Sequence, residues 1–516
     1  MKRFVVAAAM AAAVPAYGYA QTAPTPPVAV QKPYTVKGPK ERNDPYYWLR
    51  DDSRKNPQML AYLNAENAYA DSVLAATKPL QEKLFTEFVG RIKQDDSSVP
   101  ARQRGYYYYT RFETGGDYPI IARKEGTTQA PEQVLLDMPA MAEGHGFFSI
   151  REWMVSQDNG LLAFAEDTVG RRQYTMKVKT IATGELLEDR VENVQPNFVW
   201  ADDNRTIFYI EKDPVTLLSK RVKAHVLGTP ASADRLIYEE KDDSFYLGLG
   251  RTSDDKYICI VLESTVSNEQ RCTSAASPGE WRVVAPRERD LLYSADHIGN
   301  RWIIRTNWDA PNYKLMTLAD ADAAKGRAGW TDLVPHDANV FIQNFKPFDS
   351  FIAIEQRSGG NKKIRLLTNS GTSSEVASDE PAYAMALSTN LESNTTKLRY
   401  VYDSLTTPRI WYEVDAGTGE RTLLKRTPAP NYDPSNYVTE RVWASARDGT
   451  EIPVSAGLSQ GVQSRRHRGD APVRLRKLWR LDGSELVADD PEPSRPWNGV
   501  RDRAHPRRPG DGARLV

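Results

Sequence analysis

A chain of 516 residues with no net formal charge has room for two or three domains, because a single core of that size would be unusually large. Apolar residues make up 40% of the sequence and aromatic residues 10%, which indicates a folded globular protein. Thirteen of the 68 basic residues but only 8 of the 68 acidic ones follow Ser455, so the larger part of the chain is mildly acidic. That balance excludes a large basic surface, and we expect no nucleic-acid partner.

The first residues are typical of a secretory signal peptide. A basic start precedes an apolar run at 4–14, and small residues lead to Ala20, after which we expect cleavage. A membrane anchor is the alternative, but the apolar run is too short to span a bilayer, and no later segment is long and apolar enough. We therefore predict a signal peptide at 1–20, a Pro-rich leader at 21–44, and a periplasmic or secreted protein without a membrane span.

Residues 45–98 are predicted to form an N-terminal helical segment. Asn56 and Pro57 supply a helix cap and a first-turn proline, and apolar residues then recur at helical spacing. A second amphipathic run, LQEKLFTEFVGRI, follows at 80–92. Two amphipathic helices must bury their apolar faces against another part of the protein.

From residue 99 onward the hydrophobic pattern alternates with a period of two, which favours strands. Pairs of strand-like runs, such as YYYYTRFETGGDYPIIARKEG, begin 45 to 55 residues apart at 106, 161, 206, 256, 301, 351 and 398. Seven such units are typical of a β-propeller, in which each unit is a four-stranded blade. A pair of β-sandwiches is the alternative, but it does not require so regular a spacing. We predict an all-β, seven-bladed propeller at 99–435.

The chain has two cysteines, Cys259 and Cys272, on the neighbouring strand-like runs YICIVL and QRCTS. In an oxidising compartment they could form a disulfide, and two buried free thiols are the alternative. The sequence leaves both open. Neither cysteine has a metal-ligand pattern nearby and no H-E-x-x-H occurs, so we predict no metal site and no cofactor.

After the propeller, two strand-like runs at 436–455 surround the Arg447-Asp448-Gly449 turn. The order of helical segment, propeller and RDGTEIPV resembles the prolyl oligopeptidase family of serine peptidases. NDPYYWLRDD at 43–52 and ERVWASARDGTEIPVS at 440–455 are most similar to oligopeptidase B. The resemblance covers about 33–455.

The resemblance implies a peptidase of two domains. In this family the propeller packs on an α/β-hydrolase domain, a Ser, Asp and His triad lies in the cavity between them, and the cap admits only short peptides. Oligopeptidase B cleaves after Arg or Lys, whose side chains are held by acidic residues. Residues 436–455 correspond to the start of the hydrolase domain, so we expect this chain to hold the gating propeller but no triad.

The catalytic groups of such an enzyme are not expected in this chain. We predict no nucleophile elbow, which requires a G-x-S-x-G frame at a strand-to-helix turn. We also expect the histidines to be structural or exposed, because a catalytic base needs a positioned nucleophile and an orienting carboxylate. No residue is therefore predicted to be catalytic, and a periplasmic propeller that binds peptide or protein without chemistry is the alternative function. The six histidines are His145, His225, His297, His336, His467 and His505.

Residues 456–516 contain no Tyr, Phe or Ile, and twelve Arg against one Lys, a composition that does not bury a core and predicts disorder. Read one nucleotide later, codons for LRKLW at 475–479 can spell YGSYG, and codons for HPRRPGD at 505–511 can spell IRGGQEM. Both strings resemble the oligopeptidase B catalytic domain. Our hypothesis is a frameshift, through mutation or sequencing error. A basic tail for nucleic acid or an anionic surface is the alternative, although acidic residues interrupt it.

Overall fold

The computed structural model describes residues 24–38 and 40–460, in two compact units whose boundary in the chain falls between Ile92 and Lys93. The predicted signal peptide at 1–20 and most of the predicted tail lie outside these residues. The helices within the described ranges are all too short or too polar to span a membrane.

The first unit contains two helices, and their start is where the sequence placed it. The side chain of Asn56 accepts hydrogen bonds from the backbone N–H groups of Gln58 and Met59, which confirms the predicted cap. The elements are the pair β1 (Thr35–Val36) and β2 (Arg42–Asn43), a 3-10 turn at Tyr47–Leu49, α1 (Pro57–Leu74), a 3-10 turn at Ala75–Thr77, and α2 (Lys78–Gly90).

The apolar side chains of these helices are largely uncovered within the described residues. Met59 is the one buried residue of α1, and α2 has none. Phe85 is 69% exposed and Leu80 57% exposed, although both belong to the run at 80–92 whose apolar face is predicted to be buried against another part of the protein. Such a row of exposed large apolar side chains marks a surface that needs a covering partner.

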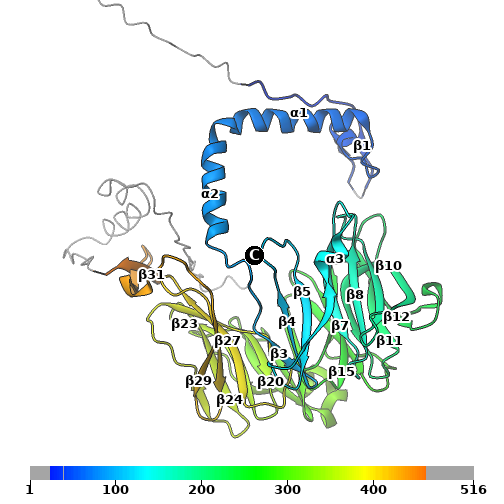
Figure 1. Cartoon of the computed structure of the whole chain (residues 1–516). Coiled ribbons are helices and arrows are strands. Elements are labelled where there is room, and N and C mark those ends of the chain that lie inside the picture. Colours follow the sequence, from blue (N-terminus) through cyan, green and yellow to red (C-terminus); the bar gives the residue numbers. More distant parts are fainter. Residues whose placement is uncertain (1–23, 39, 461–516) are drawn as a thin grey trace, which may run out of the picture. The chain divides into compact units, whose positions relative to one another are not determined.

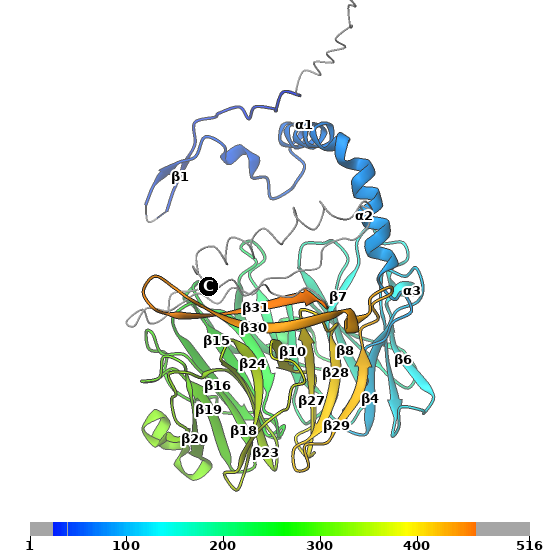
Figure 2. The same ribbon diagram turned by 90° about the vertical axis from the view of Figure 1, so that its left-hand side faces the viewer.

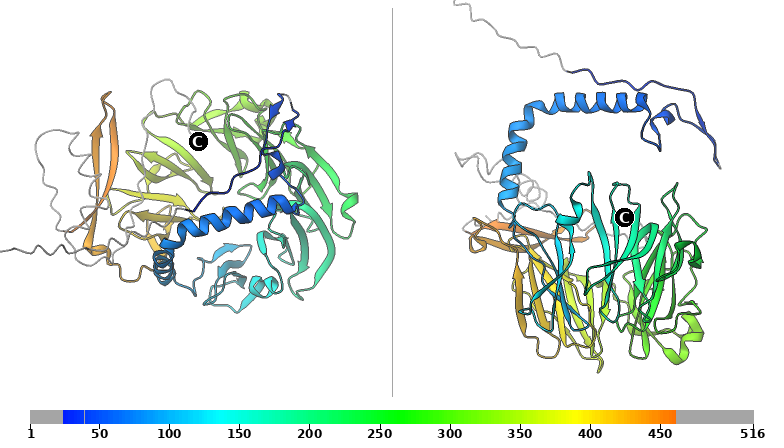
Figure 3. Two further views of the ribbon diagram at one scale, coloured as in Figure 1. Left: turned by 90° about the horizontal axis from the view of Figure 1, so that it is seen from above. Right: turned by 45° about the vertical axis from the view of Figure 1, so that its right-hand side comes forward.

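The second unit is a propeller in which seven blades follow one another round a ring (Figures 1 and 3). Blades 1, 4 and 5 are separate four-stranded sheets, blades 2 and 3 form one seven-stranded sheet, and blades 6 and 7 are joined by one parallel contact between β24 and β26. Blade 1 consists of β3 (Ala101–Gln103), β4 (Tyr106–Arg111), β5 (Ile120–Glu125) and β6 (Glu132–Asp137), and α3 (Met138–Ala142) follows it. Blades 2 and 3 consist of β7 (Ser149–Val155), β8 (Leu161–Asp167), β9 (Tyr174–Thr180), β10 (Leu186–Trp200), β11 (Thr206–Lys212), β12 (Ser219–Val226) and β13 (Arg235–Glu239), with a 3-10 turn at Ala231–Ala233.

The remaining blades have the same plan. Blade 4 is β14 (Tyr246–Arg251), β15 (Tyr257–Glu263), β16 (Asn268–Ser274) and β17 (Arg282–Val283). Blade 5 is β18 (Tyr293–Ile298), β19 (Arg301–Thr306), β20 (Lys314–Ala319) and β21 (Thr331–Val334), with a 3-10 segment at Asp320–Gly329. Blades 6 and 7 are β22 (Phe341–Pro347), β23 (Phe351–Ser358), β24 (Asn361–Thr368), β25 (Ser373–Glu375), β26 (Tyr383–Leu387), β27 (Lys397–Ser404), β28 (Ile410–Asp415) and β29 (Arg421–Arg426).

The blade count predicted from the sequence is confirmed. The seven predicted units coincide with the second strand of each blade, which is β4, β8, β11, β15, β19, β23 or β27. One strand serves two blades: β10 pairs with β9 up to Val194 and with β11 from there to Trp200. Asn193, with a φ of +56°, lies at the change of partner, where the short polar side chain tolerates the left-handed backbone.

The core of the propeller lies between blades. Each of six buried apolar clusters is shared by two consecutive blades, from the pair 1 and 2 to the pair 6 and 7. Between blades 2 and 3, for example, Phe198 and Trp200 are fully buried, and the Trp200 indole N–H donates to the Met154 carbonyl of the neighbouring blade. Each blade is thus stabilised by burying its faces against its neighbours.

The ring closes differently at what we call the seam, the contact between residues 96–104 and blade 7. None of the six clusters of described residues joins blade 7 to blade 1. Polar contacts join them instead: Lys425 Nζ lies 2.6 Å from Asp96 Oδ2, and the Arg104 N–H donates to Glu392 Oε1 over 3.0 Å. Ion pairs of this kind contribute far less than buried apolar area.

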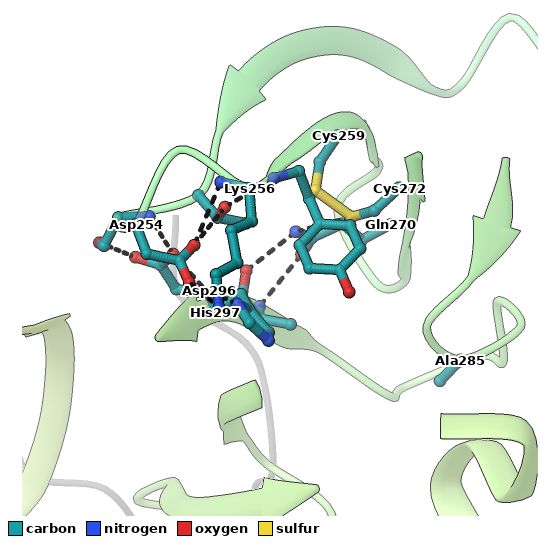
Figure 4. Close-up of a disulfide and its surroundings, with 12 residues drawn as sticks. Asp254, Lys256, Cys259, Gln270, Cys272, Ala285, Asp296 and His297 are labelled. Atoms are coloured by element: carbon teal, nitrogen blue, oxygen red, sulfur yellow. Dashed lines mark hydrogen bonds and ion pairs between the residues drawn. A yellow bond between two sulfur atoms is a disulfide. The ribbon is translucent and has the colours of Figure 1, made fainter. Parts of the chain in front are cut away.

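Cys259 and Cys272 form a disulfide, so of the two alternatives that the sequence left open the structure has the bridge (Figure 4). The residues face each other directly on β15 and β16, with a Cα–Cα distance of 4.1 Å. Both are buried in the cluster between blades 4 and 5.

The chain leaves blade 7 through a 3-10 turn at Pro434–Asn436 and forms a hairpin of β30 (Tyr437–Ser445) and β31 (Glu451–Ser459), which lies along the edge of one end of the propeller, beside blades 6 and 7 (Figures 2 and 3). Sequence composition placed the start of a disordered tail at Ala456. That boundary is corrected here, because β31 continues to Ser459 and pairs with β30 as far as Tyr437. Ladder hydrogen bonds use backbone groups, so the change in side-chain composition does not end the strand.

Candidate functional site

His225 on β12 is fully buried between two carboxylates. Its Nδ1 lies 2.8 Å from Asp234 Oδ1, and its Nε2 lies 3.0 Å from Asp189 Oδ1. Both ring nitrogens of His225 therefore lie within hydrogen-bond distance of a carboxylate oxygen. Neither nitrogen is free to take a proton from a nucleophile, as a catalytic base must.

His297 on β18 has the same arrangement. Its Nδ1 lies 2.7 Å from Asp254 Oδ2 and its Nε2 2.9 Å from Asp320 Oδ1, while its side chain is fully buried. Burial lowers the pKa of His297, but hydrogen bonds and charge from Asp254 and Asp320 outweigh it, so the pKa is raised overall. This ring, like that of His225, is held between two carboxylates rather than beside a nucleophile.

The other described histidines are placed no better for catalysis. His145 stacks on Phe148 with 5.9 Å between the ring centroids, and His336 is exposed in the link between β21 and β22. His467 and His505 lie outside the described residues. Within the described ranges, His, Cys, Asp and Glu side chains form no group of three suited to a metal ion.

The frame that a nucleophile elbow requires, G-x-S-x-G, does occur in the sequence, at Gly457, Ser459 and Gly461. The described part of this stretch is not a nucleophile elbow. Ser459 is exposed at the end of β31, an antiparallel strand whose register pairs it with Tyr437. The elbow needs a strand-to-helix turn above a sheet, and the spacing alone does not supply it.

At the end of the propeller that carries the hairpin, here called the hairpin end, polar contacts join the hairpin to the blades. Arg441 of β30 donates to the Gly360 carbonyl over 3.3 Å and to Asn361 Oδ1. Gly360 has a φ of +81°, and a Cβ there would lie 2.6 Å from Pro453 Cβ, so the hairpin packs directly on this turn. The Gly359-Gly360 pair was the signal in the sequence for this docking point, but nothing local revealed its partner.

Glu380 ties the hairpin to blade 7 at the same end. Its carboxylate accepts hydrogen bonds from the hydroxyl groups of Thr406, Thr407 and Thr439, the last of these on β30. The half-buried carboxylate thus has three hydroxyl donors. Together with the Arg441 contacts, these hydrogen bonds fix the position of the hairpin on the blades. Their role is therefore structural rather than catalytic.

The opposite end of the propeller holds an open pocket of about 540 Å³. Antiparallel strands place the turns between first and second strands at this end, away from the hairpin. Three charged side chains pair within the pocket wall, because Arg251 binds both Asp202, at 2.7 Å, and Asp255, at 3.0 Å. The pocket is polar and could receive a small polar ligand, but it contains no nucleophile paired with a base.

Comparison with known proteins places this geometry in a family. Residues 26–427 match the family described as prolyl oligopeptidase, N-terminal beta-propeller domain. Dipeptidyl aminopeptidase BI from Pseudoxanthomonas mexicana is 55% identical over 87% of this chain and 64% of that protein. Protease 2 from Moraxella lacunata is 29% identical over 84% of this chain and 63% of that protein. The chain thus spans less than two thirds of the length of these relatives.

Solved structures give the same result. Oligopeptidase B from Leishmania major superposes with a TM-score of 0.78 and 28% identity, over 86% of this chain and 66% of that one. Oligopeptidase B from Trypanosoma brucei, solved in a closed form with covalently bound antipain, gives a TM-score of 0.77 and 27% identity, over 85% and 66% of the two chains. The chain therefore belongs to the prolyl oligopeptidase family, and residues 26–427 correspond to the N-terminal propeller domain of that family.

Proposed function

We propose that the 516-residue chain acts as the cap of a serine oligopeptidase and hydrolyses no peptide bond by itself. The supporting observation is that the two buried histidines give both ring nitrogens to carboxylates. Amide hydrolysis needs a nucleophile, a free base and oxyanion donors in one place.

The test is hydrolysis of fluorogenic peptides that end in Arg by the purified chain, with Ser459→Ala as the matched control. We expect equal background rates for the two proteins. Turnover by the unaltered chain that Ser459→Ala abolishes would overturn the proposal.

For the protein with its hydrolase domain in frame, we propose cleavage of short peptides after Arg or Lys. The similarity to oligopeptidase B supports this, and the frameshift hypothesis makes it testable. The test is the nucleotide sequence of the gene after the codon for Ser455. If that sequence does not encode YGSYG and IRGGQEM in the shifted frame, the frameshift hypothesis is excluded. Restoring the frame should yield an active peptidase.

A second candidate activity is release of dipeptides from a free N-terminus, which the name of the 55% identical relative suggests. The frame-restored enzyme distinguishes the two when it is assayed on one Arg-containing peptide with a free and with a blocked amino group. Cleavage of both forms supports endopeptidase action. Cleavage of the free form alone supports a dipeptidyl aminopeptidase.

Two further proposals concern where the chain works and what covers it. We propose that the exposed faces of α1 and α2 pack on the hydrolase domain, since Phe85 and Leu80 need an apolar partner.

We also propose a periplasmic or secreted location, which the disulfide supports because such bonds persist in oxidising compartments. Cell fractionation that finds the chain in the cytoplasm would refute the location.

The alternative function is a propeller that binds peptide or protein without chemistry. The open polar pocket at the end opposite the hairpin is the observation that favours it. Calorimetric titration of the chain with short peptides tests this idea. Saturable binding that an Arg251→Ala change removes would support it, and absence of heat at millimolar peptide would exclude it.

A further inference from the structure

The junction between blades 4 and 5 is joined by a histidine with carboxylates on both sides. Asp254, on the turn after β14, belongs to blade 4, whereas His297 and Asp320 belong to blade 5. The imidazole therefore carries one hydrogen bond across the junction and one within its own blade. Figure 4 shows Asp254 and His297 beside the disulfide of blade 4.

The aromatic surroundings repeat this division between blades. The His297 ring lies edge-on to Tyr257 of blade 4, at 4.8 Å between centroids, and to Trp302 of blade 5, at 5.1 Å. The ring is thus enclosed by side chains and shielded from water. In such surroundings each of its two hydrogen bonds is electrostatically stronger than in water, and an unpaired ring nitrogen is costly.

Further contacts join the turn at 252–256 to the segment around His297. Asp254 Oδ2 also accepts from the Gly299 N–H at 3.1 Å, and Lys256 Nζ lies 3.7 Å from the same oxygen. Asp296, next to His297 in the chain, accepts hydrogen bonds from the Ser253 N–H and hydroxyl group. The two segments therefore meet through carboxylates, and the His297 imidazolium and Lys256 supply the positive charge.

We propose that His297, in its protonated form, is a pH-dependent latch between blades 4 and 5. Loss of the proton leaves a ring nitrogen lone pair facing a carboxylate, so one of the two hydrogen bonds is lost and the junction loosens. The wall of the open pocket includes Asp254, Lys256 and Tyr257, so the same event changes the shape of that pocket.

The direction of the pH effect follows from the charges around the ring. Because the pKa of His297 is raised in the folded chain, its stabilisation is complete below its unfolded value of about 6.5 and is lost as pH rises to the folded value. Burial, then Asp320 and Asp254, raise the pKa of Tyr257, so that phenol stays neutral over this range. The other charges nearby are Lys346, which acts on Asp296, and Arg282, which acts on Tyr257.

The test uses a surface variant and a matched control in the full chain. Asp320 is 38% exposed, and Asp320→Asn keeps an acceptor oxygen while removing one charge. Asp322→Asn, in the same 3-10 segment, removes the partner of Lys325 instead. We expect the fall in thermal stability with rising pH to end at a lower pH in Asp320→Asn and to be unchanged in Asp322→Asn. Identical profiles for these two variants would overturn the proposal.

A second measurement does not depend on how well a variant folds. In chain labelled with ¹⁵N-histidine, both ring nitrogens of His297 should carry protons at a pH just above that at which the histidines of the urea-unfolded chain lose theirs, with the resonances assigned by their loss in His297→Gln or by their shift in Asp320→Asn. A neutral tautomer of His297 at that pH would contradict the latch.

Discussion

The interface between blades 2 and 3 and the seam between blades 7 and 1 join similar sheets by different means. The first buries Phe198 and Trp200 in an apolar cluster, whereas the second relies on Lys425 with Asp96 and on Glu392 with the Arg104 N–H. Blades 2 and 3 are consecutive and share the strand β10, while the seam joins residues more than 280 positions apart. A ring assembled from neighbours along the chain is therefore least stabilised where its two ends meet.

The largest effect is expected from Trp200→Ala at the apolar interface. The side chain is fully buried, so its removal leaves a cavity and removes the indole hydrogen bond to the Met154 carbonyl. We expect a loss of about 3 to 5 kcal/mol in the free energy of unfolding, measured by urea denaturation. A loss below about 1 kcal/mol would show that this interface is not where the stability lies.

Removing the disulfide should have the next largest effect. The bridge closes a loop between residues 13 positions apart, and the double variant C259A/C272A should lose about 2 to 4 kcal/mol. A reducing agent should destabilise the unaltered chain by a similar amount and leave the double variant unchanged. If the reducing agent affects both proteins alike, the bridge is not the cause.

Glu152, an acidic residue of blade 2, should lower the free energy of unfolding as pH rises. Burial raises the pKa of Glu152 on β7 to about 7, which the Trp153 N–H only partly opposes. The folded chain thus binds more protons than the unfolded one between pH about 4.3 and 7, so stability falls as pH rises through that window. Glu152→Gln should gain about 1 to 3 kcal/mol at pH 8 and nothing at pH 4, and an equal gain at both would contradict this cause.

The smallest effect is expected at the seam. A double-mutant cycle on Lys425 and Asp96 should give a coupling of about 0 to 1 kcal/mol that shrinks with added salt. The pair of Lys363 and Glu375, within blade 6, serves as the control. Its coupling energy should be as small as that of Lys425 and Asp96 and should fall with salt in the same way. Coupling above about 2 kcal/mol at the seam alone would remove the contrast with the apolar interfaces.

The sequence predicted the blades well because the second strands are buried on both faces. β11, TIFYIEK, and β23, FIAIEQRS, each contain four consecutive apolar residues, and such runs recur regularly. The outer strands β17 and β25 were not predicted, since Arg282–Val283 and Ser373–Glu375 are short and exposed and carry no pattern. The change of partner inside β10 was also missed, because it depends on pairing rather than on composition.

The functional site was less accessible to sequence reasoning. Asp189 meets His225 from 36 positions away, and Arg441 meets Asn361 from 80 positions away, so no local spacing reveals either contact. The pattern around Ser459 shows the opposite problem, because the motif spacing is present while the strand that carries it has the wrong geometry. Motif and structure together, rather than either alone, separate a catalytic serine from a chance match.

The most direct test of a propeller without chemistry is labelling of the purified chain by a serine-reactive fluorophosphonate, with mass spectrometry of the product. We predict no covalent adduct on the 516-residue chain, under conditions in which the frame-restored enzyme is labelled at one serine. An adduct on Ser459, or on any other serine of the 516-residue chain, would contradict this reading of the structure.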